Sequence, residues 1–326
     1  MTVWFHDLSL LMLGLIGLVI GTHLVVRGAL DLAEHYKLSN VFIGLTILAI
    51  GTDLPELIIA IVGSINRLGG TESSGLILGD AIGSSIVQIS IVLGIAGLFG
   101  FFTLTKKQIK IDGSVMIGSI ILLFLVGYDG NITRTEGIFL IIVYLIYYLS
   151  LYREEKVNEK IKRAPTVHLF WDIASVIGGM VVVLYTSNIV VENSASLAIS
   201  LGISQALIGV LIASLGTSLP ELSVAIGAAF KEAPGLSIGN LIGSNIFDLL
   251  IPIGTGAAIS GLVMEKSLLF FDIPALLIIS LAVLLFFIRK KGLQKKEAAI
   301  LIGLYVFYAI IRLAGFMNIT GNLTNV

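Results

Sequence analysis

Ten stretches of predominantly apolar residues constrain the fold of this chain more than any other feature of its sequence. A transmembrane helix needs about 20 such residues, and open sheets cannot span a bilayer, because lipid offers no partner to free backbone groups. The sequence therefore predicts an all-α polytopic membrane protein with ten transmembrane helices. We place these helices at residues 8–30, 40–65, 74–102, 112–128, 134–152, 167–190, 204–230, 236–262, 270–289 and 297–315.

The composition supports this class. Of the 326 residues, 56% are hydrophobic and only 13% are charged, whereas soluble domains carry about 25% charged residues. This excludes a soluble enzyme, a disordered chain and a nucleic-acid binder. The absence of cysteine excludes disulfides, cysteine-ligated zinc and a thiol nucleophile. The lipid bilayer is the expected surrounding, and no protein partner is evident.

The two halves of the chain resemble each other. Ile43–Leu57 (IGLTILAIGTDLPEL) and Ile208–Leu222 (IGVLIASLGTSLPEL) are identical at nine of fifteen positions, and Gly79–Ile86 (GDAIGSSI) similarly matches Gly239–Ile246 (GNLIGSNI). We interpret the chain as a duplicated five-helix unit. Its parts are a first repeat at 1–152, a charged linker at 153–166 and a second repeat at 167–326.

An odd number of helices per repeat predicts opposite orientations. The second repeat then starts on the other side of the membrane, so that the repeats are inverted. With the N-terminus outside, 16 of the 20 Lys and Arg residues fall on the inner side, as the positive-inside rule requires. We expect both termini outside and the charged linker inside.

Each repeat carries a carboxylate beside a proline in the middle of an apolar helix. Thr52–Glu56 reads TDLPE and Thr217–Glu221 reads TSLPE. Proline removes one helical hydrogen bond and clashes with the carbonyl four residues back, so carbonyls at 49–52 and 214–217 should be freed. Carbonyls, a hydroxyl and a carboxylate at a broken helix suit a hard cation. The structural alternative is a proline kink whose Glu is simply hydrogen-bonded.

The third and eighth helices supply further polar groups. Ser84 and Ser244 follow glycines, and one turn later stand Gln88 and Asp248. These small residues also suit ordinary helix packing. Without a nearby Lys or Arg, a buried group of up to four acids must bind cations or protons. Oxygen ligands favour Ca²⁺ or Na⁺. The four candidate acids are Asp53, Glu56, Glu221 and Asp248.

The paired GTxLPEL and GxxIGSxI segments resemble the repeats of the calcium/cation antiporter superfamily, most closely the prokaryotic sodium/calcium exchangers. The resemblance covers essentially the whole chain. It implies a multi-pass antiporter of the cell membrane, not an enzyme, which exchanges Ca²⁺ for Na⁺ by alternating access and has no cofactor. It also implies that the first and sixth helices slide past the rest.

The resemblance further implies a role for each site residue. Glu56 and Glu221 would share Ca²⁺, helped by the carbonyls of Thr52 and Thr217. The middle of the site would be completed by Gln88 and Asp248. The Na⁺ ligands would be the carbonyls of Ala49 and Ser214, with Ser84, Ser218 and Ser244.

Asp53 is the main departure from the family pattern, which has Ser here, as this chain has at Ser218. An ionised Asp53 would strengthen divalent binding or change the coupling, and a protonated Asp53 would couple transport to H⁺. A carboxyl turned away from the cluster is the third possibility. Asp80 likewise replaces an Asn, for which Asn240 is the repeat partner. It is interpreted as a helix-end or entrance acid, or as a site residue.

Two other classes are disfavoured. A channel would build its pore by oligomeric symmetry, which an internal inverted repeat does not need. An intramembrane aspartyl protease would carry a Gly-x-Gly-Asp motif, but Ile77 takes the place of the first glycine before Asp80.

Overall fold

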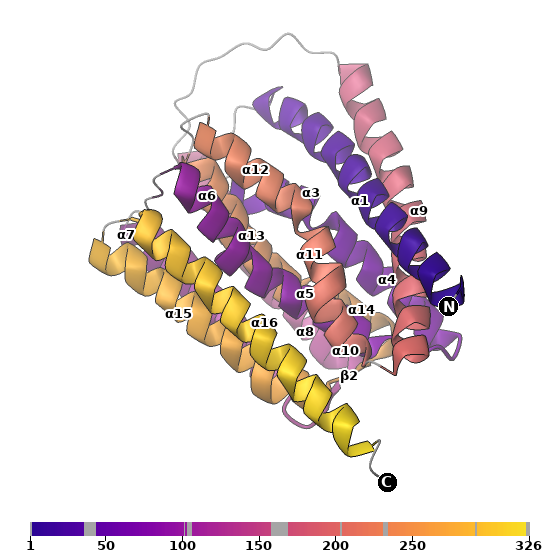
Figure 1. Ribbon diagram of the computed structural model, residues 1–326. Coiled ribbons are helices and arrows are strands. Elements are labelled where there is room, and N and C mark those ends of the chain that lie inside the picture. Colours follow the sequence, from indigo (N-terminus) through magenta and orange to yellow (C-terminus); the bar gives the residue numbers. More distant parts are fainter. Residues whose placement is uncertain are drawn as a thin grey trace.

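The computed structural model describes residues 2–35, 44–100, 102, 106–157, 169–202, 204–230, 234–290 and 292–323. Throughout these ranges the chain is almost entirely helical and forms one bundle (Figure 1). Residues 158–168, which include most of the predicted charged linker, lie outside the described residues. Residues 153–157 of that linker instead continue the preceding helix.

The first half contains five helical segments in the predicted order. They are α1 (Thr2–His35); η1 (Gly44–Leu48) with α3 (Ala49–Thr52) and α4 (Leu54–Leu68); α5 (Ser74–Val87) with η2 (Gln88–Val92) and α6 (Leu93–Phe99); α7 (Lys106–Val126); and α8 (Arg134–Val157). The elements η1 and η2 are short π-helical turns, which are frequent at functional sites.

The second half repeats this order. Its segments are α9 (Leu169–Leu201); α10 (Gln205–Ile208) with η3 (Gly209–Ala213), α11 (Ser214–Thr217) and α12 (Leu219–Phe230); α13 (Pro234–Leu250) with α14 (Pro252–Ser260); η4 (Leu268–Asp272) with α15 (Ile273–Lys290); and α16 (Lys295–Leu323). The strands β1 (Asn131–Ile132) and β2 (Leu262–Val263) pair in an antiparallel ribbon.

Within the described ranges, eight helical segments are long and apolar enough to cross a membrane, and the bent pair Gly44–Thr52 and Leu54–Leu68 makes a ninth. The described apolar part of α1 is shorter, at His6–Gly21. The polytopic all-α class is therefore confirmed, whereas the count of ten spans stays a prediction.

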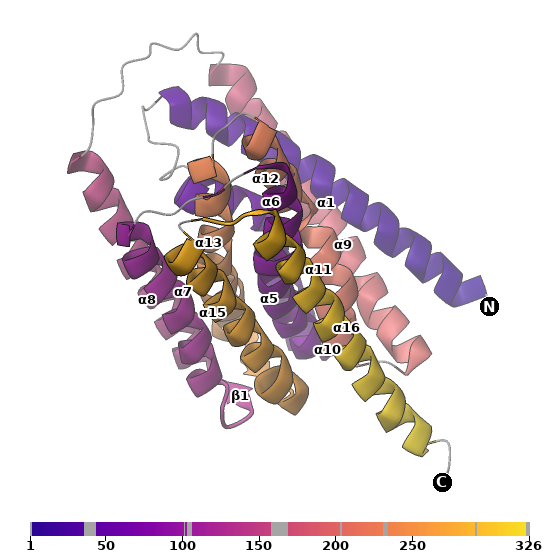
Figure 2. The same cartoon turned by 60° about the vertical axis from the view of Figure 1, so that its left-hand side comes forward.

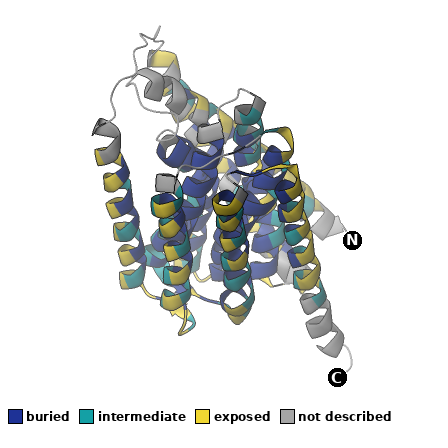
Figure 3. Cartoon of the chain, turned by 90° about the vertical axis from the view of Figure 1, so that its left-hand side faces the viewer, coloured by how far each residue is buried: buried dark blue, intermediate teal, exposed yellow. Residues whose placement is uncertain are grey.

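The bundle has a buried centre and an exposed periphery. In the spans formed by α5–α6 and α13–α14, 78% of the apolar window is buried, whereas α7, α8 and α16 bury only 28–33%. Figure 3 shows exposed residues along the outward sides of the peripheral helices. Figures 1 and 2 show α1 and α9 side by side at one edge of the bundle. The two central spans are thus the ones shielded from lipid, and polar residues on them face protein.

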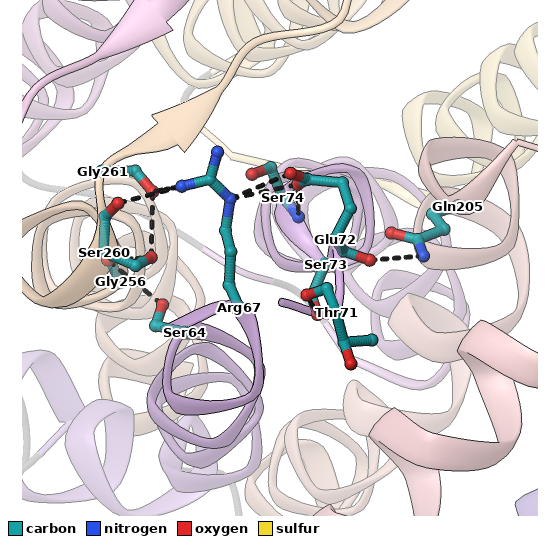
Figure 4. Close-up of polar contacts among 10 residues, drawn as sticks. All are labelled: Ser64, Arg67, Thr71, Glu72, Ser73, Ser74, Gln205, Gly256, Ser260 and Gly261. Carbon is teal, nitrogen blue, oxygen red and sulfur yellow. Dashed lines mark hydrogen bonds and ion pairs between the residues drawn. The ribbon is translucent and has the colours of Figure 1, made fainter. Parts of the chain in front are cut away.

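Turns that the topology predicts on one side of the membrane do meet in space. Arg67 Nη1 donates to the carbonyls of Ser260 and Gly261 at 2.9 and 2.8 Å, and Arg67 Nε pairs with Glu72 at 3.0 Å (Figure 4). Gln205 Nε2 donates to the Glu72 carbonyl at 2.7 Å. The β1–β2 ribbon joins the same group of turns. We call this end of the bundle the ribbon end; the charge count predicts that it is the outer side.

The opposite end is tied in the same manner. The backbone N–H of Leu293 donates to the Phe102 carbonyl at 2.8 Å, which brings together the turns before α7 and before α16. Both turns are predicted on the inner side. Turns that are predicted on one side of the membrane therefore gather at one end of the bundle.

Glycines let the two halves touch backbone to backbone. A Cβ atom at Gly79 of α5 would lie 2.7 Å from the carbonyl oxygen of Ala206, and one at Gly243 of α13 would lie 2.7 Å from that of Leu45. The α5 span therefore packs on the seventh span, and α13 packs on the second. This crossed packing places the helix breaks of both repeats beside α5 and α13.

The expected sliding helices also contact each other through glycines. A Cβ atom at Gly14 of α1 would lie 2.9 Å from the Val190 side chain of α9, and one at Gly17 would lie 2.2 Å from that of Thr186. These contacts explain the glycines of α1, although Gly178 of α9 has nothing within 4 Å.

Candidate cation-binding site

Both proline-containing spans break at the predicted place and in the same conformation. Asp53 lies between α3 and α4 with φ −87° and ψ 7°, and Ser218 lies between α11 and α12 with φ −81° and ψ 2°. The first break bends the span by 48°. Glu56 and Glu221 fall in the first turn of the helix after each break, where the helix dipole favours a negative charge.

The breaks leave fewer free carbonyls than the sequence suggests. The carbonyl of Ala49 accepts the backbone N–H of Asp53 at 3.0 Å, and that of Ser214 accepts the N–H of Ser218 at 3.1 Å. Both carbonyls thus stay in the helical ladder, and they are also approached by the hydroxyls of Thr52 and Thr217, each at 3.4 Å. The side chain of Ser214 is also used locally, since its hydroxyl donates to the Val210 carbonyl.

Three acids from two spans meet at the centre of the bundle: Asp53 and Glu56 at the first helix break, and Asp248 on α13. Asp53, Glu56 and Asp248 each offer a carboxylate oxygen, and these oxygens all lie within 4.8 Å of one another. Glu221 lies outside this tight group, but its charge acts on all three acids. All four side chains are at most 1% exposed. None of them forms an ion pair with a basic group in the part of the chain that the structure describes.

Asp53 faces this cluster and does not turn away from it. Its Oδ1 is 3.5 Å from Nε2 of Gln88, which also donates to Oδ2 of Asp248 at 3.0 Å. Gln88 is itself oriented by Asn245, whose Nδ2 donates to the Gln88 Oε1 at 2.9 Å. Gln88 begins the π-turn η2. One amide side chain thus bridges carboxylates from two different helices.

Hydroxyl groups line the same region. Ser84 and Thr217 are joined by a 3.0 Å hydrogen bond between their hydroxyls. The Thr52 hydroxyl donates to the Leu48 carbonyl at 3.0 Å. Ser218 and Ser244 are buried, and within the described part of the chain their hydroxyls have no hydrogen-bond partner. Buried hydroxyl groups therefore accompany the acids at both helix breaks.

Among the described residues, six carboxylate oxygens in this site accept no well-formed hydrogen bond. They are Oδ2 of Asp53, Oδ1 of Asp248, and both oxygens of Glu56 and Glu221. Buried polar atoms are normally hydrogen-bonded, and an unsatisfied one costs about 1–3 kcal/mol or more when charged. Oxygen atoms in this number and arrangement suit a hard cation such as Ca²⁺ or Na⁺.

Two groups at the site were not given a ligand role from sequence. Asn245 orients Gln88 through a hydrogen bond. The sequence signal for Asn245 is its place at the end of the triplet Gly-Ser-Asn, because the first repeat has Ser85 at the corresponding position. The aromatic ring of Tyr144 on α8 is buried and lies within electrostatic range of Asp53. Nothing in the pattern of α8 alone marks Tyr144 as different from its neighbouring tyrosines, Tyr147 and Tyr148.

Comparison with known proteins shows that the chain is similar to sodium/calcium exchangers over most of its length. The profile of the family described as sodium/calcium exchanger protein matches residues 6–153 and 171–314. An uncharacterised membrane protein of Methanocaldococcus jannaschii is 31% identical over 90% of this chain and 94% of its own length. The sodium/calcium exchanger MaX1 of Methanosarcina acetivorans is 27% identical over 93% of this chain and 97% of its own length.

A solved structure has the same architecture. The sodium-calcium exchanger NCX_Mj, soaked with Na⁺ and Sr²⁺, superposes with a TM-score of 0.68 and 29% sequence identity. The match covers 93% of this chain and 98% of that chain. The likeness extends over both halves and is not confined to the motifs.

Proposed function

Because the chain belongs to the sodium/calcium exchanger family, we propose that it exchanges Ca²⁺ for Na⁺ by alternating access at the cluster of Asp53, Glu56, Glu221 and Asp248. The protein is a multi-pass membrane antiporter and not an enzyme, and Ca²⁺ and Na⁺ are its substrates. What we propose is the site of the exchange, which is the carboxylate cluster, and its mechanism, which is alternating access.

One observation carries the proposal: five of the six unpartnered carboxylate oxygens lie at or just after the matching breaks of two helices, and the sixth, Oδ1 of Asp248, lies on α13, which packs on the first break. Four carboxylates without a basic partner repel one another at low dielectric, so the site must hold positive charge to be stable. One Ca²⁺ or several Na⁺ ions satisfy the same oxygens alternately. Competition for one set of ligands is what couples the two ions.

We assign the residues as follows. Glu56 and Glu221 are the Ca²⁺ ligands, because each presents two unpartnered oxygens from the first turn after a break. The carbonyls of Thr52 and Thr217 complete the Ca²⁺ position. Gln88 and Asp248 close the middle of the site. The Na⁺ ligands are the carbonyls of Ala49 and Ser214 and the hydroxyls of Ser84, Ser218 and Ser244.

We further propose two inverted repeats, at 1–152 and 167–326, joined by the inner linker 153–166. The separate matches of the family profile on either side of the linker support this division. So does a pair of equivalent contacts: Tyr147 donates to Asp112 at 3.1 Å, and Tyr308 donates to Asp272 at 2.6 Å. With the ribbon end outside, both termini lie outside.

Asp53 supports a second candidate function, an H⁺/Ca²⁺ antiporter. Its carboxylate belongs to the tight group of three acids, where the second repeat has the neutral Ser218. Three ionised carboxylates already exceed the charge of one Ca²⁺ by one, and an ionised Asp53 raises this excess to two. A proton is one way to compensate for it, and an additional Na⁺ is another.

The test compares two driving forces in proteoliposomes that contain the purified protein. Under the main proposal, an outward Na⁺ gradient drives ⁴⁵Ca²⁺ uptake and a pH gradient alone does not. Glu56→Gln and Glu221→Gln each abolish uptake, whereas Glu192→Gln, at an exposed acid of α9, leaves it unchanged. Uptake that persists in either of the first two variants would refute the assignment of the cluster.

The role of Asp53 is decided by the same assay on Asp53→Ser, which restores the residue of the second repeat. Uptake driven by a pH gradient in the wild type, and lost in Asp53→Ser, favours the H⁺/Ca²⁺ candidate. Uptake driven only by Na⁺ in both proteins rejects it.

A further inference from the structure

Asp80 is a fifth buried acid at the site, on α5, and the assignments above give it no role. Its side chain is 1% exposed. Its Oδ1 accepts a hydrogen bond from the Thr217 hydroxyl at 3.3 Å, and its Oδ2 has no hydrogen-bond partner among the described residues. Thr217 is also bonded to Ser84 at 3.0 Å. Asp80 therefore faces the break of the second repeat and not its own.

The equivalent residue of the second repeat is neutral. Asn240 stands 160 positions after Asp80, and it is fully buried with both polar atoms of its side chain unpartnered. The helices pack in the same register in both repeats, since Gly83 of α5 abuts Val210 and Gly243 of α13 abuts Leu45. Asn240 thus occupies the position that corresponds to Asp80 at the other break.

Asp80 is coupled electrostatically to the other site acids. The charge of Glu221 acts on Asp80, and the charge of Asp80 acts on Glu56 and Asp248. In the part of the chain that the structure describes, both oxygens of Glu221 are without a hydrogen-bond partner. Among the described residues, no Lys or Arg forms an ion pair with Asp80. Two buried carboxylates of this kind are stabilised when a cation lies between them.

Asp80 lies toward the ribbon end of the site. Ser74 begins α5 at the ribbon end. Asp80 lies about 9 Å further along the helix axis than Ser74, and Ser84 lies about 6 Å beyond Asp80. A cavity of about 340 Å³ opens at that end beside the first residues of α5 and α10, and Glu72 and Glu265 are among its lining residues. Asp80 is thus the site acid on the ribbon side of Ser84 along α5.

We propose that Asp80 is an additional ligand for a hard cation, Ca²⁺ or Na⁺, in a position shared with Thr217 and Glu221 at the ribbon end of the site. The second repeat has no counterpart, because Asn240 lacks the charge. The exchanger is therefore asymmetric, with tighter cation binding on the side to which the ribbon end faces. This inference deepens the proposed function and rests on it.

The test measures the half-saturating Ca²⁺ concentration on each face of the protein, in vesicles of opposite orientation under a Na⁺ gradient. Asp80→Asn should raise that concentration about tenfold on the ribbon-end face and less than twofold on the other. The matched variant Asn240→Asp, placed in the Asp80→Asn background, should transfer the tighter binding to the opposite face. Equal values for wild type and Asp80→Asn on both faces, or an equal rise on both, would overturn the proposal.

The variant Asp80→Glu distinguishes a loss of cation binding from a loss of folding, because it keeps the carboxylate. If Asp80 binds a cation, the Glu variant retains most of the affinity, and Ca²⁺ raises its thermal midpoint in detergent. If Asp80→Glu loses the affinity to the same extent as Asp80→Asn, the carboxylate is not a ligand and the inference fails. Wild-type protein without Na⁺-driven uptake would instead refute the proposed function itself, so the two failures are distinguishable.

Discussion

The contact between Gly79 and Ala206 allows a quantitative prediction about the packing that forms the site. The Cβ of an alanine at position 79 would lie 2.7 Å from the Ala206 carbonyl oxygen and 3.1 Å from its Cα. Both are backbone atoms and cannot rotate away. Ordinary contacts of a Cβ atom begin at 3.4 Å, so α5 and α10 must separate by about 0.7 Å in Gly79→Ala.

Overpacking of this kind costs about 1–3 kcal/mol. Helix propensity acts in the opposite direction, because alanine is preferred to glycine inside a helix by about 0.5–1 kcal/mol. The control is Gly118→Ala on α7, where a new Cβ would meet nothing within 4 Å. We expect Gly79→Ala to be less stable than the wild type and Gly118→Ala to be equally or more stable.

The assay is thermal unfolding in detergent, followed by intrinsic tryptophan fluorescence, since the chain has no cysteine for a thiol-reactive dye. Gly79→Ala should also weaken Ca²⁺ binding, because the wall that carries Asp80 and Ser84 moves with α5. A Gly79→Ala protein that is as stable as Gly118→Ala would show that close backbone packing does not hold α5 in place.

Three further predictions concern other contacts. Arg312→Met leaves the buried Asp272 without its 3.0 Å ion pair, so it should destabilise the protein by about 3–5 kcal/mol in thermal unfolding, and Asp272→Asn in the same chain should recover most of this loss. Glu72→Gln should lower the thermal midpoint at neutral pH. Burial raises the pKa of Glu72, but hydrogen bonds from Ser74 and the charge of Arg67 outweigh it and hold the pKa below its usual value. The difference in thermal midpoint between Glu72→Gln and the wild type should therefore persist above about pH 4.5 and disappear as the pH falls through the lowered pKa of Glu72. A difference that stays constant over this pH range would contradict the prediction. Gln88→Leu removes the amide that bridges two carboxylates, and hydrogen bonds to charged groups contribute about 1.5–3 kcal/mol. Its Ca²⁺ affinity, measured by isothermal titration, should therefore change at least tenfold, and an unchanged affinity would exclude Gln88 from the site.

Much of the fold could be predicted because the relevant signals lie within short continuous stretches of the sequence. Hydropathy along the chain located the helical segments, since a membrane span needs a continuous apolar stretch. Pro55 and Pro220 located the breaks, because a missing N–H acts within four residues of the proline. The internal match between the halves indicated that the site would be built from both.

The sequence alone also identified the four acids, since a carboxylate in an apolar helix is too costly to be incidental. The distances among them depend on how separate helices pack, and no local pattern contains that information. Only the tertiary structure placed Asp53, Glu56 and Asp248 within 4.8 Å of one another and left Glu221 outside that group.

The dependence on helix packing also explains why two other contacts of the site could not be predicted from the sequence. The bridging amide of Gln88 and the contact of Asp80 with Thr217 each join residues more than 30 positions apart. They exist because glycines let α5 and α13 approach the broken helices at backbone distance. The sequence by itself determined the all-helical class, the breaks and which apolar helices carry charged residues. The packing of one repeat against the other decided which of those charges meet.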